Sequence, residues 1–273
     1  MSTETTATPR AGFWRVLWTN ARFAPRTTLG FMRVDFVLGE VFVLSLTQMA
    51  FFAFVATLAG NPASSVSYVV VGNAVSSVTY SSIFSVCQTT DSEKQQGTLE
   101  PLLATPVSRF PLYVGRGIVP VFISLSNVAV GLVYAVFLYH VPVASGALLP
   151  LAVSVFLTAF AMVGFGLFLG GIALFLRTSI ILGNIFLFLG LVVSGVNFPV
   201  SQLPVPLQWV GYGFPLTWGV AAVRASLAGA SWVALAPDFG YLLLSGILSY
   251  ALAMGFFGVF ERLAFRTGSL VRF

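Results

Sequence analysis

The chain has 273 residues, of which 58% are hydrophobic and only 8% are charged. This composition excludes a soluble globular protein, because charged residues make up about a quarter of an average protein. The formal net charge of +5 would suggest a nucleic-acid partner in a soluble chain. Here all but one of the basic residues instead fall on the same side of a predicted membrane, as described below. We therefore expect no nucleic-acid partner.

The N-terminal region precedes the first apolar segment. Residues 1–11 are polar and threonine-rich, and we expect them to be disordered. Residues 12–36 are predicted to form an amphipathic helix, with Trp14 and Trp18 lying away from a basic stripe. That stripe consists of Arg15, Thr19, Arg22 and Arg26. Such a helix is typical of the headgroup region of a membrane, and ordinary anchoring by positive charge is the alternative interpretation.

Two long runs, 41–90 and 117–176, contain no charged residue. A bilayer core needs roughly 20 apolar helical residues per crossing, so each run has room for two membrane spans. Turn-forming residues interrupt both runs near their middle, at 60–65 and 140–146. We therefore predict an all-α integral membrane protein, a single transmembrane domain over 1–273 surrounded by membrane lipid. Its six spans are 37–59, 66–88, 117–139, 149–175, 178–198 and 239–260.

The basic residues sort by side in this six-span arrangement. All but one of the 13 lysines and arginines fall before span one, between spans two and three, after span four or after span six. The positive-inside rule makes that side cytoplasmic. Both termini are thus predicted to be cytoplasmic, with the chain in the plasma membrane. Arg224 alone lies on the opposite side.

The segment 199–237, between spans five and six, is apolar but rich in proline and tryptophan. Prolines break regular helices, and tryptophans favour the headgroup level of a membrane. We predict that this outer segment forms short re-entrant helices that cap the outer mouth of a pathway.

Several polar residues fall inside the predicted spans, where lipid offers no hydrogen-bond partner. One hypothesis is that they line or gate a substrate pathway, and the alternative is that they join neighbouring helices by hydrogen bonds. Asn127, Asn197 and the hydroxyl-bearing residues of the second span, such as Ser76, are open to the same two interpretations. For Glu40 the alternative is pairing with Arg33 or Arg177 near the cytoplasmic surface. The candidate pathway or gate residues are Glu40, Gln48, Asn73, Ser77, Tyr80 and Asn184.

Catalytic chemistry is poorly supported by this sequence. The only lysine, Lys94, follows Glu93, so the Gly-Lys pair of a phosphate-binding loop is missing and any ATP must be hydrolysed by a partner chain. One histidine and one cysteine do not suffice for a His/Cys metal cluster, and the spans hold no paired acids. We therefore predict no enzyme, no catalytic residues, no metal site and no cofactor on this chain.

The cytoplasmic loop 89–116 contains the most distinctive stretch, from Asp91 to Pro106. Asp91 or Ser92 is suited to cap a short helix, and prolines limit its length. One face of this helix would be apolar, with Leu99, Leu102 and Leu103. The opposite face would carry Glu93, Gly97 and Glu100. The simplest interpretation is a short interfacial helix that caps the bundle.

The same stretch resembles the loop after the second span in type-2 ABC transporter permeases. The pattern, a glutamate followed by Gly-Thr-Leu-Glu-x-Leu-Leu-x-x-Pro, is met at Glu93, Gly97, Thr98, Leu99, Glu100, Leu102, Leu103 and Pro106. Arg109 and Gly115-Arg116 agree with the start of span three. The segment from Ser194 to Pro199 is similar to the family's proline-bearing loop after span five.

The resemblance implies a half-transporter with an N-terminal elbow helix over 12–36. Its partners would be a second permease copy or paralogue and two ATPase subunits, which would bind ATP and magnesium. The helix after span two would be a coupling helix, and the outer segment a lid. The residues in contact with the ATPase would be Asp91, Glu93, Gly97, Thr98, Leu99 and Glu100.

The general look of the chain places it near the daunorubicin-resistance permeases of this family. This favours export of an amphipathic drug-like or lipid-linked molecule, with a polysaccharide or glycolipid exporter as the alternative. An ion-coupled secondary carrier and a purely structural membrane subunit remain as hypotheses from other classes.

Overall fold

The computed structural model of the chain describes residues 39, 42–43, 45–60, 65–95, 109–173, 175 and 179–267. These residues form helices joined by turns, and none of them belongs to a strand. The expectation of an all-α protein is therefore confirmed for this part of the chain. The helices are α3 (Ser45–Ala59), α4 (Val66–Gln95), α6 (Arg109–Tyr139), α7 (Leu148–Ala173), α8 (Ser179–Val193), the 3-10 turn η3 (Val200–Gln202), α9 (Val205–Gly213), α10 (Pro215–Leu227) and α11 (Trp232–Thr267).

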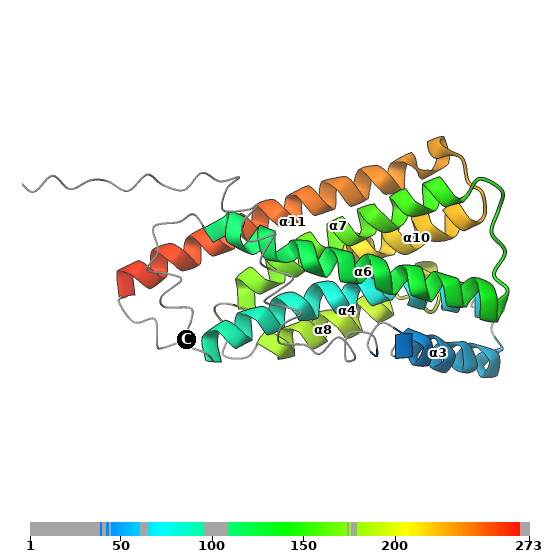
Figure 1. Cartoon of the computed structure of the whole chain (residues 1–273), viewed down its shortest axis with the longest axis horizontal. Coiled ribbons are helices and arrows are strands. Elements are labelled where there is room, and N and C mark those ends of the chain that lie inside the picture. The colour runs from blue at the N-terminus through cyan, green and yellow to red at the C-terminus, as the bar shows by residue number, and fades with distance from the viewer. Residues whose placement is uncertain are drawn as a thin grey trace, which may run out of the picture.

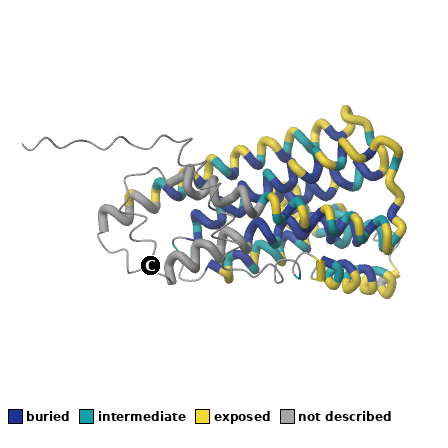
Figure 2. Tube along the Cα trace, in the orientation of Figure 1, coloured by how far each residue is buried: buried dark blue, intermediate teal, exposed yellow. Residues whose placement is uncertain are grey.

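The long helices lie roughly side by side along the longest axis of the molecule (Figure 1). Helix α4 packs against α3, α6, α7, α8 and α10, and α7 packs against α4, α6, α8, α10 and α11. These two helices form the centre of the bundle, and Figure 2 shows buried residues running through it with exposed residues along the outer faces. A helix that is buried all round is expected only in the interior of a bundle.

Three segments of the described residues are long and apolar enough to cross a membrane: Val121–Tyr139, Leu148–Ala173 and Trp232–Val259. They coincide with the predicted spans three, four and six. Two shorter apolar helices, Ser45–Leu58 and Ser179–Val193, lie within the predicted spans one and five. Helix α4 covers the predicted span two, but its many hydroxyl side chains lower its hydropathy. The count of six crossings stays a prediction.

The helix ends differ from the predicted span limits. Helix α11 begins at Trp232, inside the predicted outer segment 199–237, while α8 ends at Val193, before the predicted limit at 198. At the other end of the bundle, α4 and α6 extend into the predicted loop 89–116. Span limits were set from hydropathy, whereas helical hydrogen bonds continue for as long as the backbone permits.

Short helices do lie between α8 and α11, as expected from the prolines. Pro204 precedes α9 directly, and Pro215 is the first residue of α10. Proline suits the first turn of a helix, because the N–H group it lacks has no partner inside the helix there. Several earlier expectations lie outside the described residues: the disordered segment 1–11, the elbow helix 12–36, Glu40, and the centre of the coupling helix, which includes Gly97, Thr98, Leu99 and Glu100.

The turn 140–147 and residues 194–231 meet at one end of the bundle, which we call the Arg224 end (Figure 1). His140, directly after the last residue of α6, has a positive φ of 52°, a conformation that histidine adopts more readily than most residues. The N–H group of Ala144 donates a hydrogen bond of 3.0 Å to the carbonyl of Leu227, at the end of α10. The turn between α6 and α7 is thus fastened to the connection between α10 and α11.

Candidate functional site

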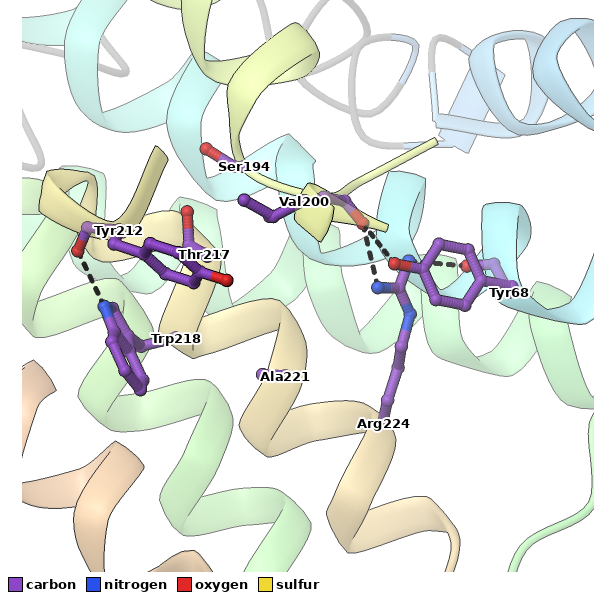
Figure 3. A pocket seen from close by; sticks show the side chains of 9 residues that line it. Tyr68, Ser194, Val200, Tyr212, Thr217, Trp218, Ala221 and Arg224 are labelled. Carbon is purple, nitrogen blue, oxygen red and sulfur yellow. Dashed lines mark hydrogen bonds between the residues drawn. The ribbon is translucent and has the colours of Figure 1, made fainter. Parts of the chain in front are cut away.

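Arg224 is the centre of a polar cluster at this end. Helix α10 directs its guanidinium toward residues 194–199, the irregular segment that follows α8 (Figure 3). Nη1 donates to the carbonyl of Gly195 at 2.9 Å, and Nη2 donates to the carbonyl of Val196 at 2.8 Å. Nη2 also donates to the carbonyl of Tyr68 in α4 at 2.8 Å. One side chain therefore joins α10, α4 and the segment 194–199.

Tyr68 completes this clamp from the first turn of α4. Its ring lies under the guanidinium, with 3.3 Å between the Arg224 Cζ and the ring centroid. Its hydroxyl donates to the carbonyl of Gly195 at 2.9 Å. A guanidinium over an aromatic face gains a favourable cation–π interaction, and the gain is larger when both groups are withdrawn from water.

Gly72 permits the close approach of α4 and the segment 194–199. A Cβ atom at this position would overlap the carbonyl oxygen of Val196 and lie 2.5 Å from Nη2 of Arg224. Gly195 adopts a φ of 71°, which side-chain-bearing residues rarely tolerate. The clamp thus depends on two glycines as well as on its polar groups.

The Arg224 guanidinium is a charged group with incomplete compensation. Burial lowers the pKa of Arg224 to about 10, so the side chain, in a helix outside the three long apolar segments, stays charged at neutral pH. It makes no ion pair with any of the described residues. Its Nε is buried without a hydrogen-bond partner, as is the hydroxyl of Ser194.

A network of amide side chains adjoins the clamp. Asn73 of α4 donates to the side-chain oxygen of Asn197 at 2.8 Å and to the carbonyl of Val69 at 2.9 Å. Gln48 of α3 donates to the side-chain oxygen of Asn73 at 3.3 Å and makes a longer contact of 3.5 Å with the Ser76 hydroxyl. The segment 194–199 is therefore joined to α3 and α4 as well as to α10.

Two of the six candidate pathway residues, Gln48 and Asn73, are brought together in this network. Ser77 is buried elsewhere along α4 and donates to the carbonyl of Ala74 at 2.7 Å. Tyr80, also in α4, and Asn184, in α8, are both partly buried. Asn73 and Ser77 are both buried inside the helix bundle of this chain. Their role in a pathway stays a prediction.

Two of the six candidate coupling residues lie in the last turns of α4, away from the Arg224 end. Asp91 and Glu93 fall within α4, whose helical backbone continues to Gln95. The remaining four candidates lie outside the described residues. The assignment of all six to an ATPase contact stays a prediction.

The sequence contained one sign of the clamp, because Arg224 was the single basic residue on the far side of the predicted topology. Its partners could not be inferred, since they are mainly backbone carbonyls. Tyr68 lies 156 residues away from Arg224 along the chain, and no local pattern links the two.

The described chain thus has an all-helical bundle, three helices fit to cross a membrane and a strongly fastened segment after α8. Its sequence matches the family of the ABC-2 type transporter over residues 23–228. The chain belongs to this family and is a membrane-embedded ABC transporter permease. The expected resemblance is confirmed.

The chain is similar to the probable multidrug ABC transporter permease YbhR of Escherichia coli, in strain K12 and in O157:H7. In both cases the identity is 26% over 126 residues, which is 46% of this chain. The match covers 32% of the length of each relative. Less than a third of the relative is therefore shared at the level of aligned sequence.

Proposed function

We propose that the chain is the permease subunit of an ATP-driven exporter, with ATP hydrolysed by a separate ATPase. The observation that carries the proposal is the family match over 23–228, which includes the loop with the Gly-Thr-Leu-Glu pattern. The sequence has no phosphate-binding loop of its own, since its only lysine follows a glutamate. Two such permeases, identical or paralogous, would enclose the pathway and bind two ATPase subunits.

The proposed topology has six crossings in the plasma membrane with both termini in the cytoplasm. The uneven placement of the basic residues supports it, as do the five apolar helices that coincide with predicted spans. In this orientation the Arg224 end faces outward. The helices α9 and α10 would then form the lid of the pathway, held to α4 by the clamp.

The proposed substrate is an amphipathic drug-like or lipid-linked molecule. The similarity to a probable multidrug ABC transporter permease supports this class. Substrate-dependent transport would require ATP and would persist without an ion gradient. Transport that collapses with the ion gradient and continues without ATP would instead identify a secondary carrier.

A first experiment purifies the tagged chain from its native membranes in mild detergent and identifies the proteins that co-purify. We expect a stoichiometric ATPase and measurable ATP hydrolysis. In the proposed contact, Glu100 is a charge partner for basic groups of the ATPase. The variant Glu100→Arg reverses this charge and should reduce co-purifying ATPase and transport at least tenfold, because like charges at an interface oppose association. Membrane insertion should not change.

The matched control is Glu4→Arg, which makes the same charge reversal in the segment 1–11. It should retain the ATPase and its activity. A Glu100→Arg variant that transports normally would remove the coupling assignment. A wild-type chain that purifies alone and without ATPase activity would contradict the proposed function.

A further inference from the structure

A pocket of about 180 Å³ opens at the Arg224 end. Its lining residues come from α4, α9, α10, η3 and the irregular segment after α8. Three of them carry aromatic rings, and Figure 3 shows Tyr212 and Trp218 on one side of the group and Tyr68 on the other. Val200 and Ala221 add apolar side chains. The pocket therefore has mainly aromatic and apolar walls.

The polar groups of the clamp are turned to the fold and not to the pocket. The Nη groups of Arg224 donate to three backbone carbonyls, and its Nε has almost no exposed surface. The Tyr68 hydroxyl donates to the carbonyl of Gly195. The Ser194 hydroxyl is also without exposed surface, and Figure 3 shows it directed away from the other lining side chains. A carboxylate that entered the pocket would lose its hydration and find these donors engaged or out of reach, and an ammonium group would meet the positive charge of Arg224.

The polar groups of α10 at the pocket are engaged in the same way. The Thr217 hydroxyl donates to the carbonyl of Gly211, and the indole N–H of Trp218 donates to the carbonyl of Tyr212 at 2.9 Å. These two bonds tie α10 to α9. The rings of Tyr212 and Trp218, with 6.2 Å between their centroids, are thus held as one wall of the pocket.

The volume of the pocket matches a single ring. An apolar protein cavity of about 150 Å³ is large enough to bind benzene, so 180 Å³ accommodates one six-membered ring with a small substituent. Aromatic pairs gain free energy beyond the burial of their surface when their centroids lie about 4.5–7 Å apart. We propose that this pocket binds one uncharged aromatic ring, which packs against Tyr212 and Trp218.

The exposed face of α9 gives such a ring a route to the pocket. Tyr212 is 43% exposed although it lines the pocket, and Trp209 of the same helix is 75% exposed. Exposed tryptophans are typical of the headgroup level of a membrane, where amphipathic aromatic molecules also collect. The inference goes beyond the proposed function, because ring binding is a property of the single chain and needs neither ATP nor a partner. Its test is therefore a binding measurement without transport.

The test uses the full chain in nanodiscs of zwitterionic lipid and three fluorinated probes of matched size. The probes are 4-fluorobenzyl alcohol, 4-fluorobenzoate and 4-fluorobenzylammonium, and fluorine NMR records the saturable line broadening that empty nanodiscs do not cause. At neutral pH we expect the uncharged alcohol to bind about tenfold or more tightly than either ion, because the pocket offers a charged group no partner. Absence of saturable binding of the alcohol, or equal binding of either ion, would overturn the proposal.

Competition shows whether the pocket prefers an aromatic ring. Unlabelled benzyl alcohol should displace the fluorinated alcohol about threefold or more effectively than cyclohexylmethanol, which has a similar shape but no aromatic face. Equal displacement by the two alcohols would identify a merely apolar cavity, open to a lipid chain as well, and would contradict the aromatic assignment.

Two pairs of variants test the place of binding without removing the clamp. Ala221→Phe fills the pocket and should weaken binding of the fluorinated alcohol about tenfold or more, whereas Ala228→Phe, at an exposed site beyond the end of α10, should leave it unchanged. Tyr212→Leu removes a ring from the wall and should weaken binding about threefold or more, and the conservative Tyr212→Phe should restore it. Binding that survives both Ala221→Phe and Tyr212→Leu would place the probe elsewhere and overturn the proposal.

Discussion

Two contacts inside the bundle hold the same fold by different means. Where α7 meets α11, small residues allow the helices to approach, and the rings of Phe160 and Tyr250 lie 5.1 Å apart between their centroids. Where α4 meets the segment 194–199, the contact is made by hydrogen bonds and by the charge of Arg224. The first contact depends on complementary shape, and the second depends on hydrogen-bond donors that match the free carbonyls.

The difference follows from what a lipid-facing bundle can use. The hydrophobic effect that drives the helices of soluble proteins together is weak when lipid replaces water, so membrane helices associate through close packing or through hydrogen bonds. Regular helices such as α7 and α11 can pack closely over their whole length. The irregular segment 194–199 cannot, because its free carbonyls need donors. Arg224 donates to two of these carbonyls, those of Gly195 and Val196, and to the carbonyl of Tyr68 in α4.

The largest effect should come from Arg224→Leu, which breaks the polar contact. It leaves three carbonyl bonds unmade in a buried place, and we expect a loss of about 3 kcal/mol or more in the free energy of unfolding. Titration with a denaturing detergent, followed by circular dichroism, measures the loss. The control Arg262→Leu, at an exposed position of α11, should change stability by less than about 0.5 kcal/mol. Equal losses would show that Arg224 is not a structural clamp.

A smaller effect is expected from Gly164→Ala, which breaks the shape-dependent contact. The added Cβ would lie 2.9 Å from the ring of Tyr250 and 3.1 Å from the carbonyl of Gly246. Overpacking of this kind costs about 1–3 kcal/mol. Gly255→Ala, where a Cβ meets nothing within 4 Å, should be neutral or stabilising by up to about 1 kcal/mol. The same unfolding titration compares the two, and a stable Gly164→Ala variant would argue against tight packing there.

The smallest effect sharpens the comparison by isolating one polar bond. A double-mutant cycle with Asn73→Ala and Asn197→Ala should give a coupling energy of about 0.6 kcal/mol and no more than about 1.7 kcal/mol, the range of side-chain hydrogen bonds inside membrane proteins. The matched cycle combines Asn73→Ala with Asn184→Ala and should give a coupling energy near zero, because Asn73 and Asn184 share no hydrogen bond. Coupling of equal size in both cycles would mean that the bond between Asn73 and Asn197 is not the cause.

Much of the fold was predictable because hydropathy and turn chemistry are local. The apolar runs located the long helices, and the prolines of 199–237 indicated the short helices α9 and α10. The sequence singled out Gln48 and Asn73 because they are polar residues inside predicted spans. Their sequence positions left two interpretations, and the structure shows that they hydrogen-bond between helices, while a role in a pathway is untested.

The sequence by itself determined the class of protein, since an uncharged run of membrane-spanning length and the motif after span two are readable without a fold. Only the tertiary structure decided the role of Arg224. Its hydrogen-bond acceptors are main-chain carbonyls, which every residue possesses, so no pattern of side chains could identify them. A pocket beside Arg224 likewise could not be read from the sequence, because its walls come from α4, α9, α10 and the segment 194–200, which meet only when the chain folds.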